Sequence, residues 1–264
     1  MHRQSVHLKD VEPTHDAAPT GPRRPVIAID GPAGAGKSTL AAHLARRFGL
    51  LNIETGAMYR ALALKAIEGD LAFGDEAPLL ELAANTHIAL DPHADGNRVQ
   101  LDGVDVSQRI READVTSAAS QISIHPRLRA WMVELQRALG AHGGVVMEGR
   151  DIGTAVFPDA EVKIFLDAAP EVRGSRRFRQ VVPAPAPGQL ESRQAPAPES
   201  AAQQQAAQQA IIDEMRERDL RDRNRAESPL RPAVDAVILD STAMSLEEVL
   251  VRAEEIVRAH LPPA

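Results

Sequence analysis

Residues 31–38 read Gly-Pro-Ala-Gly-Ala-Gly-Lys-Ser and match the phosphate-binding loop pattern GxxxxGK[ST] at every fixed position. An apolar run suited to a buried strand, Val26–Asp30, precedes the loop, and we expect a helix over Ser38–Phe48 directly after it. In this context the glycines let successive backbone N–H groups point inward at a polyphosphate, and the helix start adds its positive end. The alternative is a glycine-rich turn without a ligand. Because the flanking pattern is present, we predict a nucleoside triphosphate site.

The loop also predicts how such a ligand is held. Lys37 is expected to reach the outer phosphates, and the hydroxyl of Ser38 is expected to bind Mg²⁺. Only four of the 30 basic residues are lysines, so a lysine at position 37 indicates a need for a compact point charge in place of a planar guanidinium. The expected triphosphate-binding residues are Gly31, Pro32, Ala33, Gly34, Ala35, Gly36, Lys37, Ser38 and Thr39.

The composition excludes several classes of protein. The chain has 264 residues, enough for a substantial core, and no cysteine, which excludes disulfides, thiolate metal sites and a cysteine nucleophile. We expect a cytoplasmic protein. The absence of cysteines is compatible with this reducing compartment. The net charge of −7 argues against a general nucleic-acid binder, and no apolar run approaches the roughly 18 residues of a membrane span. Residues 1–24 are polar, and we interpret them as a disordered extension.

Five short apolar runs predict a parallel sheet. They are rich in Val, Ile and Leu without strict alternation, as is typical of strands covered on both faces. Since helical stretches lie between them, we predict an α/β fold with helices on both faces of the sheet. Ligands of such sheets bind beyond the carboxyl ends of the strands, so the loop should share one rim with Glu54–Arg60, Gly149–Thr154 and Asp240–Thr242. The five strands are expected at Val26–Asp30, Leu50–Ile53, Val145–Glu148, Val162–Asp167 and Ala236–Asp240.

Two excursions interrupt the alternation of strands and helices. His87–Leu90 and Arg98–Asp105 show strand-like patterning around a turn, and with a helix expected over Pro126–Leu139 they should form a small lobe over the rim. The stretch 181–210 is rich in Pro, Ala, Gln and Ser and cannot bury enough apolar surface to fold as a core element. We interpret it as a flexible arm, with the alternative that Ala201–Arg223 continues as one helix.

Arginines mark two further places near the rim. Arg150 and Asp151 follow the third strand and form either a structural ion pair or, because of their position, a phosphate fork and an acceptor for a ligand donor. In the segment Arg218–Arg225, positions 218, 222 and 225 share one helical stripe. A solvated charge run is the default interpretation, but phosphoryl transfer needs many positive groups, so we favour an arginine-bearing lid. The other limb of this lid is expected to carry Arg173, Arg176 and Arg177.

Taken in order, these motifs resemble the bacterial cytidylate kinases, a family of P-loop nucleoside monophosphate kinases. The resemblance runs from about Val26 to the C-terminus, whereas the loop alone would indicate only a superfamily. Three departures stand out. Thr55 occupies a position where serine is expected, and Glu148 one often held by aspartate, so Glu148 is assigned no role. The stretch 181–210 is longer and more disordered in composition than the usual lid of the family. The motifs that carry the resemblance lie at residues 29–37, 55–60, 149–154, 157–160 and 218–225.

The resemblance implies a P-loop NTPase domain over residues 25–264, with an inserted monophosphate-binding lobe at about 86–130 and a lid at about 170–225. It implies transfer of the γ-phosphoryl group of ATP to CMP or dCMP with Mg²⁺, and we expect a monomer whose partners are these small molecules. The implied ligands of the acceptor phosphate are Thr55, Arg60, Arg150 and Arg225. The implied cytosine-reading residues are Ser120, Arg129 and Asp151, and the sugar contacts are Arg218 and Asp222. The implied catalytic residues are Lys37, Arg150, Arg176 and Arg225.

Two other functions compete with this interpretation. Another small-molecule P-loop kinase, such as a shikimate or dephospho-coenzyme A kinase, would not need the residues that read the base. A nucleotide-dependent switch or RNA-binding regulator would use the arginines as a phosphate-backbone patch. The acidic net charge and the 3% aromatic content argue against RNA binding.

Overall fold

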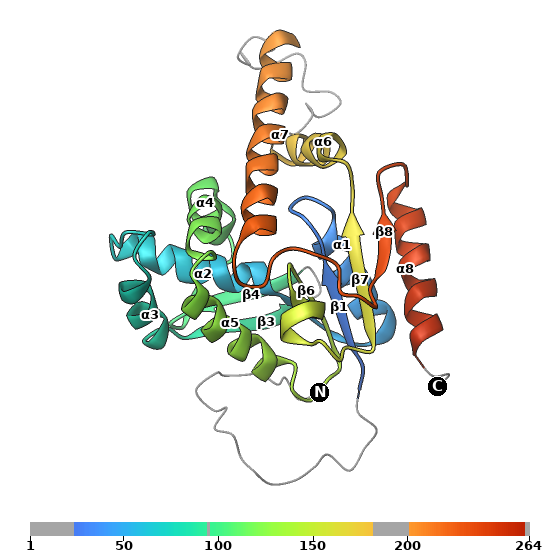
Figure 1. The fold of residues 1–264 in the computed structure, drawn as a ribbon, viewed down its shortest axis with the longest axis horizontal. Coiled ribbons are helices and arrows are strands. Elements are labelled where there is room, and N and C mark those ends of the chain that lie inside the picture. Colours follow the sequence, from blue (N-terminus) through green and yellow to red (C-terminus); the bar gives the residue numbers. More distant parts are fainter. Residues whose placement is uncertain (1–23, 94–95, 182–200, 262–264) are drawn as a thin grey trace, which may run out of the picture.

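The computed structural model describes residues 24–93, 96–181 and 201–261 (Figure 1). The predicted extension over residues 1–24, apart from Arg24, lies outside the described residues. So do residues 94–95 of the predicted turn and residues 182–200 of the predicted arm. Within the three described ranges, no helix is long and apolar enough to cross a membrane.

A five-stranded sheet with all neighbouring strands parallel forms the centre of the fold, in the order β2-β6-β1-β7-β8. The five predicted strands are confirmed to within one residue at each end. The register pairs Asp30, the last residue of the central strand, with Gly149 and Phe165, so the carboxyl ends of three strands meet at one edge. The strands are β1 (Val26–Asp30), β2 (Leu51–Glu54), β6 (Val145–Gly149), β7 (Val162–Asp167) and β8 (Val237–Asp240).

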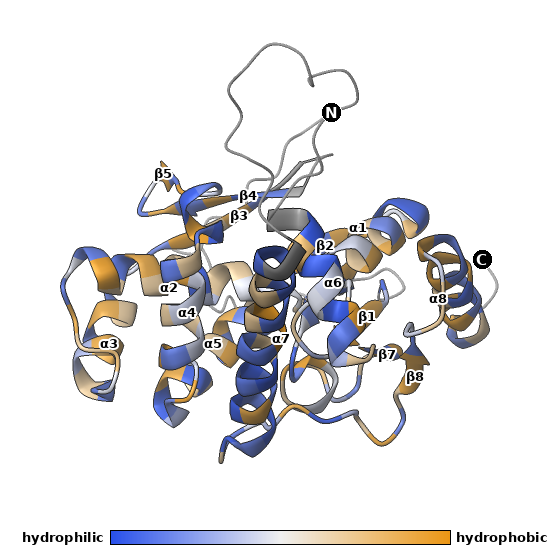
Figure 2. Cartoon of the chain, turned by 90° about the horizontal axis from the view of Figure 1, so that it is seen from above, coloured by the Kyte–Doolittle hydropathy of each residue, from blue (hydrophilic) through white to orange (hydrophobic). Residues whose placement is uncertain are grey.

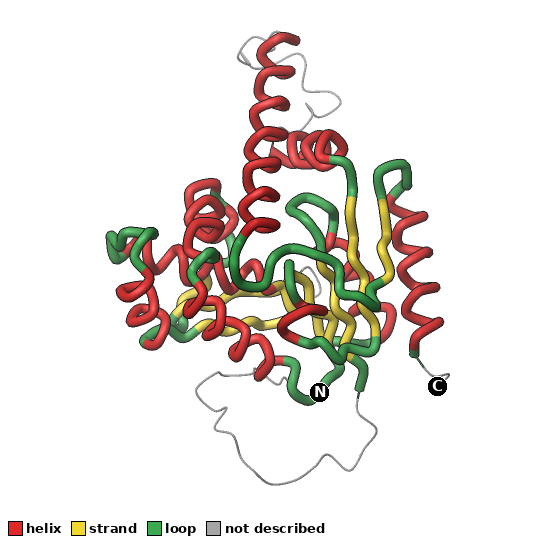
Figure 3. Tube along the Cα trace, in the orientation of Figure 1, coloured by secondary structure: helices red, strands yellow, loops and turns green. Residues whose placement is uncertain are grey.

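Helices cover both faces of this sheet (Figure 3). On one face, α1 (Lys37–Phe48) and α8 (Leu246–His260) bury Ile27 and Ile29 of the central strand. On the other face, Val26 and Ala28 pack with α5 (Pro126–Leu139) and the π-helical turn η3 (Ile152–Val156). Because residues on both sides of β1 are buried, its sequence shows a continuous apolar run without alternation.

A second core lies beside the sheet and belongs to the predicted lobe (Figure 1). Its strands form a separate antiparallel sheet in the order β3-β4-β5, as the patterning predicted. The apolar core of this lobe also takes in Met58 and Leu62 of α2 and Leu79 of α3, so it reaches beyond residues 86–130. Its elements are α2 (Thr55–Glu68), α3 (Glu76–Ala84), β3 (Ile88–His93), β4 (Gly96–Leu101), β5 (Val104–Asp105), η2 (Arg109–Arg111) and α4 (Ala113–Ile122), together with α5.

Two packed helices, α6 (Pro170–Val181) and α7 (Ala201–Asn224), rise from the carboxyl edge of the sheet, and we call them the lid (Figure 1). Helix α7 is hydrophilic over most of its length (Figure 2). It nevertheless buries Ile212 and Met215, and Ile212 lies so close to α6 that a Cβ at Gly174 would come within 2.2 Å of it. The prediction of a flexible arm is therefore wrong for residues 201–210, which form the first turns of α7. Alanine and glutamine favour helix, so a low-complexity composition does not prevent helix formation once a few apolar residues anchor it.

Candidate active site

The phosphate-binding loop connects β1 to α1 through residues that only glycine suits. Gly31 has φ 149°, and a Cβ there would stand 2.0 Å from the carbonyl oxygen of Leu166 on the neighbouring strand. Gly36 caps α1 with φ 100° and supplies no side-chain acceptor to the first turn. The N–H groups of that turn are therefore left for an anion.

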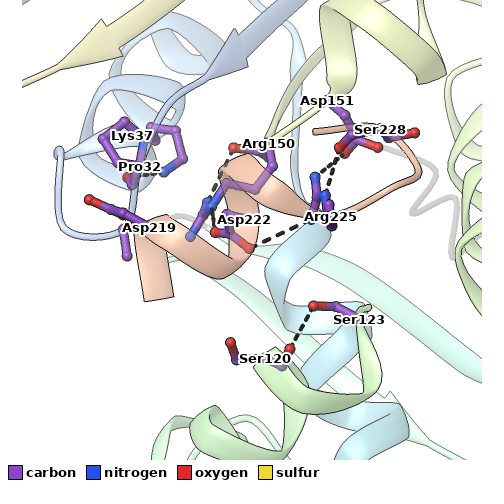
Figure 4. Close-up of polar contacts among 12 residues, drawn as sticks. Pro32, Lys37, Ser120, Ser123, Arg150, Asp151, Asp219, Asp222, Arg225 and Ser228 are labelled. Carbon is purple, nitrogen blue, oxygen red and sulfur yellow. Dashed lines mark hydrogen bonds and ion pairs between the residues drawn. The ribbon is translucent and has the colours of Figure 1, made fainter. Parts of the chain in front are cut away.

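Lys37 is buried at the start of α1 and folds back onto its own loop. Its Nζ donates to the carbonyl oxygen of Pro32 at 2.7 Å (Figure 4). Burial lowers the pKa of Lys37 well below its ordinary value, and the positive charge of Arg150 lowers it further. A polyphosphate in the loop would raise this pKa again, because its negative charge stabilises the protonated lysine.

Glu148, the residue without an assigned role, lies buried at the end of β6 beside the loop. Burial raises its pKa, as does the neighbouring Glu54, whereas Lys37 and a hydrogen bond with Ser38 lower it. Its Oε1 atom is buried without a hydrogen-bond partner. A carboxylate oxygen and a hydroxyl side by side are the kind of donors that a hard divalent cation prefers.

Across the same rim, charged side chains from three elements form a chain of alternating charges, which we call the acceptor cluster (Figure 4). Arg150 Nε donates to Asp222 Oδ2 at 2.8 Å, and Asp222 Oδ1 lies 3.6 Å from Arg225. Arg225 in turn lies 3.9 Å from Asp151 Oδ1, while Asp151 Oδ2 accepts from Arg129 at 2.5 Å. These residues come from the end of β6, the end of α7 and the first turn of α5, so the fold brings distant segments together.

Several polar side-chain atoms of the predicted site, most of them on arginines, are buried without a hydrogen-bond partner. Burial lowers the pKa of Arg218 to about 10, with Arg150 as the next cause, and its Nε has no partner. A buried donor or acceptor left unpaired costs about 1–3 kcal/mol, so several in one place indicate groups that await a ligand. In the part of the chain that the structure describes, the buried unpaired atoms of the predicted site are Arg60 Nε, Ser120 Oγ, Arg129 Nε, Arg218 Nε and Arg225 Nη2.

The remaining predicted acceptor residues are held by the protein itself. Thr55 Oγ1 donates to the carbonyl oxygen of Glu148 at 2.7 Å. Arg60 pairs with Glu54 at 2.5 Å, which leaves its Nε as the unpaired donor.

Ser120 lies on α4, apart from the acceptor cluster in Figure 4. The buried Ser120 hydroxyl has no hydrogen-bond partner, so it makes no hydrogen bond to the other predicted base-reading residues.

Two lid arginines reach the phosphate-binding loop. Arg173 is 2% exposed; it donates to the carbonyl oxygen of Ala33 at 2.9 Å and to Asp219 of α7 at 2.6 Å. Arg176 donates to Ser241 Oγ at 3.1 Å and lies 3.4 Å from the carbonyl oxygen of Ala35. The lid helices thus lie directly against the loop, and Arg176 is the predicted catalytic arginine of the lid.

Sequence reasoning missed two side chains of this region, Glu148 and Tyr59. The Tyr59 ring centroid lies 5.7 Å from the guanidinium carbon of Arg129, a cation–π distance. Burial raises the pKa of Tyr59 to about 12. The only signal was its place in the segment 55–60 after β2, which gives no hint that the ring faces an arginine from α5.

Comparison with known proteins identifies the family. Residues 27–259 match the family model for cytidylate kinase. The chain belongs to the cytidylate kinase family. The match runs from β1 into the last residues of α8, so it contains the phosphate-binding loop, the lobe, the acceptor cluster and the lid. The predicted family membership and P-loop fold are confirmed.

Known cytidylate kinases cover nearly the whole chain. The one from Solibacter usitatus is 46% identical over 244 residues, which make up 92% of this chain and 97% of that protein. The one from Pelotomaculum thermopropionicum is 48% identical over 227 residues, 86% of this chain and 92% of that protein. A solved shikimate kinase from Acinetobacter baumannii has a TM-score of 0.36 at 14% identity, covering 89% of this chain and 92% of its own, a likeness too low to bear on the reaction.

Proposed function

We propose that the protein transfers the γ-phosphoryl group of ATP to CMP or dCMP, giving ADP and CDP or dCDP. The observation that carries this proposal is the pairing of two anion sites on one rim: a phosphate-binding loop and, beside it, a cluster of buried arginines with unpaired donors. One phosphate-bearing ligand would leave the unpaired arginine donors of the second site without a partner. Membership of the cytidylate kinase family supports the choice of CMP.

On the donor side, the loop N–H groups would hold the β- and γ-phosphates of ATP, and Lys37 would exchange its bond to Pro32 for one to a phosphate oxygen. Mg²⁺ fits beside them, because Ser38 offers a hydroxyl and Glu148 an unpaired carboxylate oxygen. When bound, the ion would neutralise charge on the phosphate oxygens.

On the acceptor side, Arg150 and Arg225, assisted by Arg60 and Thr55, would hold the phosphate of CMP. The paired Arg129 and Asp151 suit cytosine, which presents an amino donor next to ring acceptors. Uracil carries a carbonyl oxygen where cytosine carries the amino group, so that oxygen would face the Asp151 carboxylate. The unpaired hydroxyl of Ser120 would complete the base site, and Arg218 with Asp222 would contact the sugar.

The mechanism needs no strong base. The attacking phosphate oxygen is already ionised, so the protein has to align it with the γ-phosphorus, neutralise both anions and exclude water. Arg176, held near the loop by Ser241 and Ala35, is proposed to reach the transferring group. The lid would exclude water, since an open site would hydrolyse ATP.

A coupled assay of ADP release across CMP, dCMP, UMP, AMP and shikimate tests this function. We expect kcat/KM to be highest for CMP or dCMP, lower for UMP, and near background for AMP and shikimate. A preference for AMP or shikimate would contradict the proposal. We further propose a cytoplasmic monomer whose partners are these small molecules, since one chain supplies every group of the proposed site; size-exclusion chromatography with light scattering tests the monomer.

A further inference from the structure

We propose that Asp30 is a positioning residue that fixes the turn carrying Arg150 and Asp151, and so couples the donor loop to the acceptor cluster. Asp30 is the last residue of β1, directly before Gly31 of the phosphate-binding loop. This inference rests on the proposed function, in which Arg150 and Asp151 bind CMP. Asp30 itself touches neither substrate in this proposal.

Both side-chain hydrogen bonds of Asp30 go to this turn. Its side chain is buried, and each of its two carboxylate oxygens accepts one backbone hydrogen bond: Oδ1 from the N–H of Ile152 at 2.8 Å and Oδ2 from the N–H of Gly153 at 2.7 Å. These N–H groups belong to the two residues after Asp151 and open the turn η3. A carboxylate at this point caps the turn as an acidic residue caps a helix start.

The turn held in this way sets two side chains of the acceptor cluster. Asp151 directly precedes Ile152 and Gly153, whose N–H groups are bonded to Asp30, so these bonds fix the direction in which the chain leaves Asp151. Its neighbour Arg150 points to Asp222, and Asp151 itself points to Arg129. A change in the direction of this turn would therefore move the phosphate fork and the base-reading carboxylate together.

Burying the carboxylate of Asp30 lowers the stability of the fold, and its two hydrogen bonds to the turn offset this loss. Burial raises the pKa of Asp30 to about 6, against the opposing effect of the two hydrogen bonds. An apolar residue would fill the end of β1 without this cost, but it would leave the N–H groups of Ile152 and Gly153 unpaired.

The decisive variant is Asp30→Asn, which keeps the size but replaces one acceptor oxygen by an NH₂ group that faces a backbone N–H. Steady-state kinetics should show KM for CMP rising roughly tenfold with a lower kcat, since one unmade buried hydrogen bond costs about 1–3 kcal/mol, and KM for ATP changing less than about threefold. The matched control is Glu161→Gln, whose carboxylate likewise accepts a backbone hydrogen bond, from the N–H of Val26 at 2.8 Å, but at the amino end of β1, the opposite end of the strand from Asp30. The control should lower Tm and leave both KM values unchanged.

A second variant guards against misfolding and against a direct effect of the lost charge. Gly153→Ala keeps the carboxylate but adds a methyl group 3.4 Å from Asp30 Oδ2 and 3.2 Å from Lys163 Cδ. It should raise KM for CMP in the same direction and by less. The positioning role would be overturned if KM for CMP and KM for ATP changed equally. It would also be overturned if both variants lowered Tm without changing either KM.

The proposed function is tested separately by Asp151→Asn in the same assay. If that variant leaves KM for CMP unchanged, the assignment of the base site fails, whatever Asp30 does. If it raises KM for CMP while Asp30→Asn and Gly153→Ala do not, only the role of Asp30 fails.

Discussion

The phosphate-binding loop and the acceptor cluster both serve anions, but they are built in opposite ways. The loop uses eight consecutive residues, and most of its positive character comes from backbone N–H groups and a helix start. The acceptor cluster uses guanidinium groups from α5, α7 and the end of β6, each held by a carboxylate. A local sequence motif can encode the first kind of site, whereas the second exists only once the chain has folded.

Removing the single lysine of the loop should have the largest effect. Lys37→Ala is expected to lower kcat by about 1,000-fold or more, because no other side chain of the loop can supply positive charge to the phosphates. Its thermal stability without ligand should not fall, since a buried cation with a lowered pKa costs stability. Activity within tenfold of the parent protein would show that the backbone alone suffices.

The acceptor cluster should tolerate the loss of one member better than the loop does. Arg150→Ala should reduce kcat/KM for CMP by roughly 100-fold, since a hydrogen bond to a charged group contributes about 1.5–3 kcal/mol, and KM for ATP should change little. Arg252→Ala on the exposed face of α8 is the matched control and should have no effect. Unchanged kinetics of Arg150→Ala with CMP would remove Arg150 from the site.

Glu148 interacts with both the phosphate-binding loop, through Lys37, and the acceptor cluster, through Arg150. Glu148→Gln keeps the shape and removes the charge, so the Mg²⁺ concentration for half-maximal activity should rise by about tenfold. The titration is run at saturating ATP and CMP, with Glu255→Gln on the surface of α8 as control. An unchanged Mg²⁺ dependence would separate Glu148 from the metal.

The smallest expected effect is on the free energy of unfolding at acidic pH. Burial raises the pKa of Asp222, but Arg150, Arg218 and Arg225 outweigh it and hold this pKa below its ordinary value of 3.8. A carboxyl group with a lowered pKa contributes stability above the unfolded pKa, and this contribution is lost as pH falls below about 4. Urea unfolding between pH 5 and pH 3 should therefore show a steeper loss for the parent protein than for Asp222→Asn. Parallel curves would mean that the arginines do not stabilise the charged form.

The sequence allowed the sheet and the loop to be predicted almost residue by residue, because both depend on local patterns. Apolar runs marked the five strands, and the glycine spacing marked the loop. For the start of α7 the favoured interpretation, a flexible arm, was wrong, and the alternative of one helix over Ala201–Arg223 is confirmed; the choice depends on the packing of Ile212 and Met215, which the Ala- and Gln-rich composition does not show.

The acceptor cluster could be predicted only in part. The helical stripe at 218, 222 and 225 followed from spacing, but the roles of these residues toward a ligand followed only from the family resemblance, and their ion-pair partners Arg150 and Asp151 were not predicted. Glu148 and Tyr59 were missed, because their neighbours come from other elements of the fold. Pairwise contacts between distant segments are set by tertiary packing, which a single sequence does not display.

The buried side chain of Arg173 has a mechanical consequence. Its guanidinium donates to the loop carbonyl oxygen of Ala33 and to Asp219 of α7, and the last turn of the same helix carries Asp222 of the acceptor cluster. A swing of α7 away from the sheet must either break this bridge or pull on the cradle of ATP. A movement of α7 that weakens the binding of CMP would therefore also weaken the binding of ATP. Because such coupling is reciprocal, binding of either substrate would raise the affinity for the other.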